Sequence, residues 1–289
     1  MNHQSTGAAL TATPTIALLL ALLCSAASAK SPCGDLGECK ALVEINASDG
    51  DIGFHFLMDG DELTAGKVQR PDGRTLFRTE ALRQLNEQTY TELFVESSEP
   101  LCFDPLTDDD PENDDEDFVT LADFLARWDA GAYRFVGFSD DGRAAGRSNL
   151  NFYLPAAPAN LVYDDANGFI SWDAGEDLGE CADVETLSAM VANDDLPAHP
   201  RNVKVATWEI VFEPDVEDDH PASGMNYTVR VPGDIAPRRV KVPRSYRMAL
   251  PDDTPVKFEV GAITKSDNAT FSEEGDVCLN EVLGCEEAD

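Results

Sequence analysis

The sequence predicts a mostly β protein that contains two β-sandwich-like domains and one or two short helices. Apolar and polar residues alternate over many short runs, which is the pattern of half-buried strands. Turn-forming pairs such as Asp-Gly separate these runs, as they do in antiparallel hairpins. A proline-containing segment, residues 154–161, divides the runs into two sets. The 289 residues are 43% hydrophobic, which is enough for each set to bury a core.

The first 29 residues have the pattern of a secretion signal. An apolar run, Ile16–Leu23, precedes Ala27-Ser28-Ala29, the small-residue pattern at which signal peptidase cleaves. This run is about half of the roughly 20 apolar residues that a membrane span requires. We therefore expect cleavage after Ala29 and export of the mature chain to the periplasm or the extracellular space, without membrane insertion.

An even number of cysteines in an exported chain favours disulfide bonds. Removal of the leader leaves six: Cys33, Cys39, Cys102, Cys181, Cys278 and Cys285. Their spacing leaves all 15 pairings open. The first two and the last two are close enough to close short loops, in which case the remaining pair would join. A zinc site is disfavoured because the mature chain has no CxxC motif and three histidines.

The first domain, residues 30–154, is predicted to be an antiparallel β domain with one helix at about 119–130. Residues 53–61, GFHFLMDGD, alternate and end in a turn, and His55 is interpreted as an exposed strand residue. In the helix, Thr120 is a candidate N-cap for an apolar stripe that begins at Leu121 and ends at Trp128. This spacing favours Trp128 as a core residue rather than part of a ligand site.

The second domain, residues 155–289, resembles a fibronectin type III domain. PAAPANLVYDDANGFISWDAG is similar to the first two strands of that family, with Trp172 as the buried tryptophan. WEIVFE resembles the third strand, and LPDDTPVKFEVGAI resembles the late strand motif. An insertion at about 173–204 includes a short helix that Asp183 is expected to cap. The resemblance implies a sandwich that mediates contacts and implies no catalysis; the pairing also resembles exported bacterial proteins.

The net charge of −34 makes nucleic acid and anionic membranes unlikely partners. Residues 108–117, DDDPENDDED, contain eight acids but match no helix-loop-helix calcium loop, so a solvated loop is favoured. Two Asp pairs around a strand are candidate calcium ligands: Asp49 with Asp51, and Asp59 with Asp61. A turn requires the same residues for conformational reasons alone. Calcium is therefore a weak expectation, and no other cofactor is predicted.

Residues 238–247, RRVKVPRSYR, form a basic run in this acidic chain. On a strand, Val240 and Val242 would face inward, and Arg239 and Lys241 would form an exposed face near Arg244. This candidate anion-binding face could contact acidic loops of the same chain, which is favoured, or an anionic polymer. No motif of nucleophilic, metalloprotease or phosphate-binding chemistry is present.

The sequence therefore predicts an exported, non-catalytic binding or adhesion-type protein. Its expected partner is a protein or polysaccharide of the cell envelope or the extracellular space. The alternatives are an accessory or degenerate carbohydrate-active protein and a calcium-stabilised structural spacer.

Overall fold

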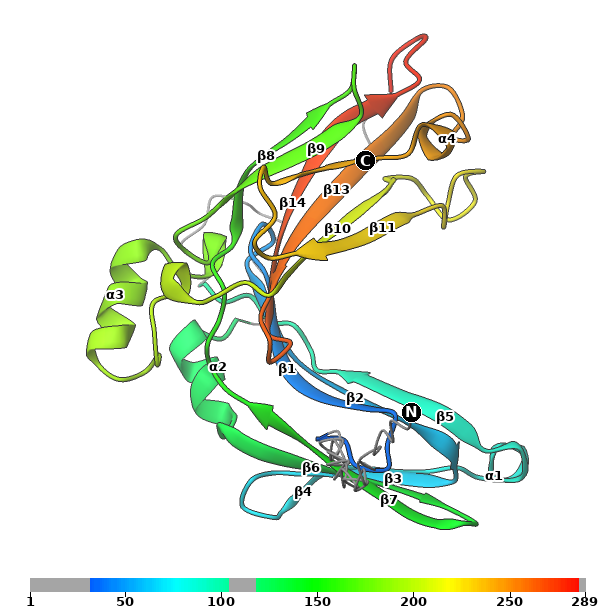
Figure 1. Ribbon diagram of the computed structural model, residues 1–289, viewed down its shortest axis with the longest axis vertical. Coiled ribbons are helices and arrows are strands. Elements are labelled where there is room, and N and C mark those ends of the chain that lie inside the picture. Colours follow the sequence, from blue (N-terminus) through cyan, green and yellow to red (C-terminus); the bar gives the residue numbers. More distant parts are fainter. Residues whose placement is uncertain (1–31, 104–117, 286–289) are drawn as a thin grey trace, which may run out of the picture. The chain divides into compact units, whose positions relative to one another are not determined.

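A seven-stranded sheet joins strands from the two halves of the chain (Figure 1). The computed structural model describes residues 32–103 and 118–285, so the predicted leader and the acidic segment 108–117 lie outside the described residues. The strand order of this sheet is β11 (Tyr227–Pro232), β10 (Thr207–Pro214), β13 (Thr254–Ile263), β14 (Ala269–Leu279), β1 (Glu38–Asn46), β2 (Asp51–Leu63) and β5 (Tyr90–Glu96).

Two smaller sheets complete the β structure of the described residues, which confirms the predicted mostly β class. The four-stranded sheet has the order β4 (Thr75–Glu80), β3 (Ala65–Gln69), β6 (Gly131–Ser139) and β7 (Gly142–Leu150). The three-stranded sheet has the order β12 (Arg239–Lys241), β9 (Phe169–Ala174) and β8 (Pro158–Asp164). Both contribute apolar side chains to clusters that also contain residues of the large sheet, which gives a sandwich-like, multi-sheet architecture.

The alternation of apolar residues explains why these runs form strands. In β1, Ala41, Val43 and Ile45 are fully buried, and their neighbours in the sequence are only partly buried. In the second half, Trp172 of β9 and Trp208 of β10 meet edge to face with ring centroids 5.7 Å apart. Every second side chain along these strands therefore points into the space between facing sheets and fills it.

The described residues contain four short α-helices rather than the predicted one or two: α1 (Gln84–Gln88), α2 (Leu121–Arg127), α3 (Val184–Ala192) and α4 (Arg244–Arg247). The two expected helices are present, and both have the predicted caps. The Thr120 side chain accepts a hydrogen bond from the Asp123 N–H, and Asp183 accepts one from the Thr186 N–H. Neither α1 nor α4 buries a residue, so neither has an apolar stripe that the sequence could reveal.

The tryptophan that follows α2 packs as the sequence suggests, although the helix ends before it. Trp128 is extended, and its ring stacks on Phe54 with centroids 4.0 Å apart. Trp128 therefore packs against the first hydrophobic cluster from the end of the helix rather than from within it.

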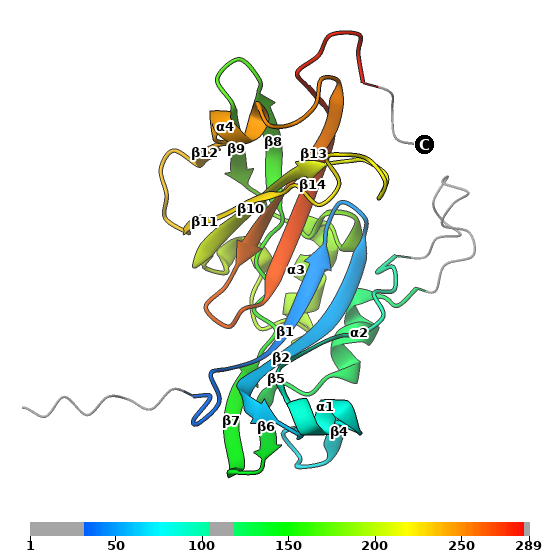
Figure 2. The same ribbon diagram turned by 90° about the vertical axis from the view of Figure 1, so that its right-hand side faces the viewer.

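Parallel pairing of β1 with β14 connects the two halves of the large sheet (Figure 2). Glu44 lies opposite Ala269, and Asn46 lies opposite Phe271. The buried side chain of Asn268 supports this junction: its Oδ1 accepts from the Val43 N–H at 3.1 Å, and its Nδ2 donates to the carbonyl of Asn151 at 2.7 Å.

The apolar residues fall into two clusters, but these do not follow the chain strictly. Leu178, Leu187, Met190 and Leu196 of the insertion belong to the same cluster as β1, β2 and α2. The boundary placed after residue 154 stays a prediction. The described residues form one compact unit, and the large sheet contains strands from both sides of that boundary. Among the described residues, no helix has the length and apolar character needed to cross a membrane.

Candidate functional site

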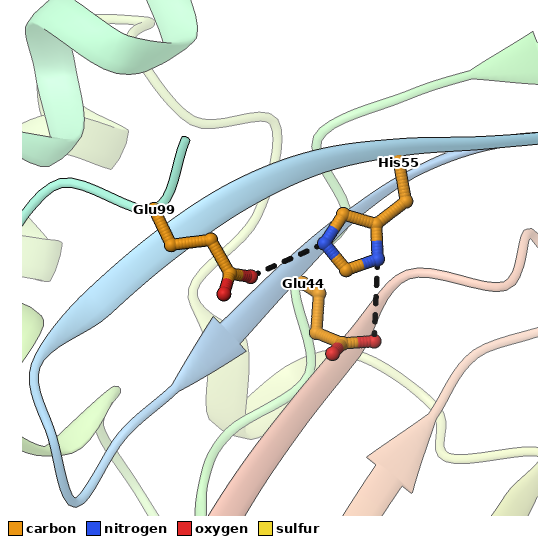
Figure 3. A group of neighbouring side chains, drawn as sticks. All are labelled: Glu44, His55 and Glu99. Carbon is orange, nitrogen blue, oxygen red and sulfur yellow. Dashed lines mark hydrogen bonds and ion pairs between the residues drawn. The ribbon is translucent and has the colours of Figure 1, made fainter. Parts of the chain in front are cut away.

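Strand register brings an imidazole and carboxylates together on one face of the large sheet. His55 of β2 lies opposite Glu96 of β5, and Glu44 of β1 lies opposite Gly53 of β2. Paired residues point to the same side of a sheet, so these side chains share a face. Glu99, in the segment after β5, reaches the same point, and Figure 3 shows Glu44 and Glu99 at the two ring nitrogens of His55.

The ring of His55 is surrounded by acids at close range. Its Nε2 lies 3.2 Å from an oxygen of Glu99 and 3.7 Å from one of Glu96. Its Nδ1 lies 3.8 Å from an oxygen of Glu44. His55 is only 4% exposed, so its interpretation as an exposed strand residue is wrong. Its face of β2 is covered by neighbouring side chains, including Phe94, whose ring meets the imidazole edge to face.

Gly53 provides the space in which these groups meet. A Cβ atom at this position would lie 2.6 Å from Oε1 of Glu99 and 2.8 Å from Nε2 of His55. Any side chain there would occupy the space toward which the carboxylate and the ring nitrogen point. The absent side chain at Gly53 is therefore a geometric requirement of the cluster.

The pKa values of the cluster reflect its burial and its excess of negative charge. Burial raises the pKa of Glu44, and the charges of Glu99 and Glu96 raise it further against the effect of His55. Burial acts to lower the pKa of His55, but its bond to Glu99 and the nearby carboxylates raise it overall. The hydrogen bond from His55 lowers the pKa of Glu99. The cluster thus favours a cation at its centre.

Of the four Asp residues proposed for calcium, Asp49 and Asp51 lie at the start of β2, and Asp59 and Asp61 lie near its end. Asp51 begins β2, and it accepts a hydrogen bond from Asn46 Nδ2 at 2.8 Å. Burial, followed by the charge of Glu99, raises the pKa of Asp51 to about 6. Asp49 lies in the preceding turn, and Asp59 and Asp61 lie where the β2–β5 register shifts. Within the described part of the chain, the one group with three metal-compatible donors is Glu44, His55 and Glu99, so calcium at the Asp pairs stays a prediction.

The candidate anion-binding face lies on the edge strand β12. Arg239 and Lys241 are exposed, and Val240 between them is buried. Both cations lie over the ring of Phe169 on β9, with Arg239 Cζ 4.8 Å and Lys241 Nζ 5.4 Å from its centroid. Arg244 is exposed at the start of α4.

The sequence favoured contacts between this face and acidic loops of the same chain. Among residues 32–103 and 118–285, no ion pair of this kind is present. None of the ion pairs formed there involves Arg239, Lys241 or Arg244. Two other basic residues of the run have structural surroundings: Arg238 lies over the ring of Trp208, and Arg247 donates to the carbonyl of Asp165.

Three disulfides join the six cysteines: Cys33 with Cys39, Cys102 with Cys181, and Cys278 with Cys285. This is the pairing that results when the close pairs form local loops. The second disulfide connects the segment that follows Glu99 to the 3-10 turn Gly179–Cys181 of the insertion. It therefore holds the segment that carries Glu99.

Sequence reasoning missed the His55 cluster because its members lie far apart in the chain. Glu44 and Glu99 are 55 positions apart, and only the β1–β2–β5 register places both beside His55. The local signal was a histidine on the opposite side of a strand from Phe54 and Phe56, next to a glycine on its own side.

Comparisons with known proteins do not assign this chain to a family. No family model matches the chain, and no curated protein matches it. Among solved structures, it has a low similarity to the one described as "Structural insight into host cell surface retention of a 1.5-MDa bacterial ice-binding adhesin", with a TM-score of 0.23 and 13% identity. The match covers 87% of this chain and 66% of that chain, just under two thirds of its length.

Proposed function

We propose that this chain is an exported, non-catalytic binding protein that contacts an anionic polysaccharide of the cell envelope or the extracellular space. The proposed contact surface is the basic face formed by Arg239 and Lys241 of β12 together with Arg244 of α4. Three disulfides are compatible with an oxidising compartment outside the cytoplasm. The leader pattern at residues 1–29 is the second reason for proposing export.

We also propose that the second predicted domain, residues 155–289, is a fibronectin type III-like module. The arrangement of β12-β9-β8 against β11-β10-β13-β14 supports this proposal, because it pairs a three-stranded sheet with four strands around one apolar cluster. The burial of Trp172 and Trp208 within that cluster also supports it. Such a module supplies a rigid platform for contacts rather than a catalytic centre.

The clustering of exposed cations on β12 and at the start of α4 carries the proposed ligand class. Five basic residues occur within residues 238–247 without an acid, in a chain whose net charge is −34. The three exposed cations form no ion pair with a described carboxylate. Arginine forks bind carboxylate and other oxyanion groups by paired hydrogen bonds. The ring of Phe169 holds Arg239 and Lys241 by cation–π contact, which reduces the side-chain entropy lost on binding.

The acidic remainder of the surface favours a selective contact. The net negative charge opposes the approach of a polyanion, but charges more than about 8 Å away are screened at physiological salt, so the local charge of a basic face decides the contact. Uronic or sulfated sugars that meet β12 at its open sheet edge therefore gain attraction locally. Neutral glycans gain nothing from these charges, so charge is the expected basis of discrimination.

Binding of defined oligosaccharides tests this proposal. We would titrate the tag-free chain from residue 30 with a heparin oligosaccharide, an oligogalacturonate and neutral dextran, using calorimetry at 50 and 150 mM salt. We expect at least one anionic probe to bind and dextran not to bind. Arg239→Gln with Lys241→Gln should weaken binding at least tenfold and reduce its salt dependence, because two counter-charges are lost.

A charge-matched variant provides the control. Arg143→Gln with Arg147→Gln removes the same charge from two exposed positions on β7, away from β12 in the sequence and in a different sheet. It should leave the affinity unchanged. Equal loss in the two double variants, or no binding of either anionic probe at 50 mM salt, would reject β12 as the contact surface.

A further inference from the structure

We propose that Glu44, His55 and Glu99, with Glu96 beside them, form a binding site for one divalent first-row transition ion, for which Zn²⁺ is the best-fitting candidate. The site is independent of the basic face, since it lies on β1, β2 and the segment after β5. It also differs from the Asp pairs considered for calcium. The inference follows from donor type, geometry, available space and charge.

The donors are of the right type and lie close together. One ligand atom from each of Glu44, His55 and Glu99 lies within 4.8 Å of the other two. Around a tetrahedral zinc ion with bonds of about 2.1 Å, donors are about 3.4 Å apart. The pairs at His55 Nε2, 3.2 Å to Glu99 and 3.7 Å to Glu96, span that value.

The space above Gly53 is the place for the ion. A Cβ atom built on this glycine would lie 2.6 Å from Oε1 of Glu99 and 2.8 Å from Nε2 of His55, so both donor atoms border this space, and the ion would lie between them and farther from the Gly53 backbone than that Cβ atom. Glu44 lies directly across the β1–β2 ladder from Gly53, and its carboxylate is at the other ring nitrogen, 3.8 Å from Nδ1 of His55, so it would turn toward the Nε2 side to join the ion. His55 is nine-tenths buried, which removes the competing water from one side of the site.

The charge of the cluster calls for a cation. Three carboxylates around one imidazole leave a net charge of −2 even when His55 is protonated. A divalent ion would offset the repulsion among Glu44, Glu96 and Glu99 at a partly buried position. An imidazole nitrogen with carboxylate oxygens suits Zn²⁺ or Mn²⁺, whereas Ca²⁺ selects oxygen ligands alone. The competing arrangement is a protonated His55 that alone holds Glu44 and Glu99.

Metal titration of the EDTA-treated, tag-free chain from residue 30 tests the site. We expect one Zn²⁺ to bind with a dissociation constant of micromolar or tighter and to raise the unfolding temperature. In NMR spectra of ¹⁵N-labelled imidazoles, Zn²⁺ should shift the His55 signals and leave those of His199 and His220 in place. Ca²⁺ at matched ionic strength should do neither. Stability and ring shifts that respond identically to both ions, or not at all, would favour the metal-free imidazolium.

Three variants and one control locate the ion. His55→Gln and Glu99→Gln should each weaken Zn²⁺ binding at least tenfold. Gly53→Ala should do so without loss of the fold, because its methyl group meets the ends of the Glu99 and His55 side chains rather than backbone. Glu92→Gln removes an equal charge from an exposed position on β5 and should change the affinity by less than twofold. Unchanged Zn²⁺ binding in Gly53→Ala would overturn the proposed location.

Discussion

Removal of the disulfide between Cys102 and Cys181 should destabilise the protein more than removal of the one between Cys33 and Cys39. The first disulfide spans 79 positions and the second spans six. A disulfide restricts the unfolded chain by an amount that grows with the logarithm of the loop it closes. The loop-entropy relation gives about 4.5 kcal/mol for the long loop and about 2.2 kcal/mol for the short one.

The comparison is well matched because the four cysteines share one environment. All four are buried and belong to the same hydrophobic cluster, so replacing each pair by alanine removes similar buried area. The difference in unfolding free energy between the two double variants, about 2 kcal/mol, then reflects the difference in loop entropy alone. The segment tied by the long disulfide also carries Glu99, so its loss acts close to the proposed metal site.

Urea unfolding provides the assay. Cys102→Ala/Cys181→Ala and Cys33→Ala/Cys39→Ala would be compared with the parent chain at pH 7 without reductant, using circular dichroism and tryptophan fluorescence. Coincident transitions from the two probes license a two-state free energy. We expect the long-loop variant to have the lower midpoint. Equal free energies of unfolding would refute the loop-entropy reasoning and assign the effect of both disulfides to local packing.

Three further perturbations test the core, the strand junction and the sheet charge. Leu187→Ala should cost about 2–5 kcal/mol of unfolding free energy in urea, because this fully buried residue anchors the insertion to the first cluster. Asn268→Ala should cost about 2–3 kcal/mol in the same assay, because it leaves the buried Val43 N–H and Asn151 carbonyl without their partner; a cost below 0.5 kcal/mol would contradict this role. Burial, followed by the charge of Glu273, raises the pKa of Glu259 from 4.5 to about 7. Between these values the unfolded chain loses the proton that the folded chain retains, so stability falls as pH rises and then levels above 7. Glu259→Gln should therefore stabilise the protein by about 1 kcal/mol at pH 8, allowing for solvent screening, and not at pH 4, as measured by urea unfolding; an equal gain at both pH values would contradict the sign.

The local order of apolar and polar residues was sufficient to predict strands and helices that have an apolar side. The alternation in β2 and the caps of α2 and α3 depend on neighbours within a few positions, and each is readable along the chain. Helices α1 and α4 escaped prediction because they bury no residue. The parallel pairing of β1 with β14 also escaped, because it joins residues more than 200 positions apart.

The same distinction explains why the basic face was visible in the sequence and the metal site was not. Arg239 and Lys241 are two positions apart on one strand, so period-two alternation alone places them on one side. His55 acquires its carboxylates from β1 and from the segment after β5, through two independent registers. A slip of one residue in either register would turn a carboxylate to the opposite face. The buried alternation that fixes these registers, with Val43, Ile45, Phe54 and Phe56 all inward, is therefore also what determines the position of the proposed ion.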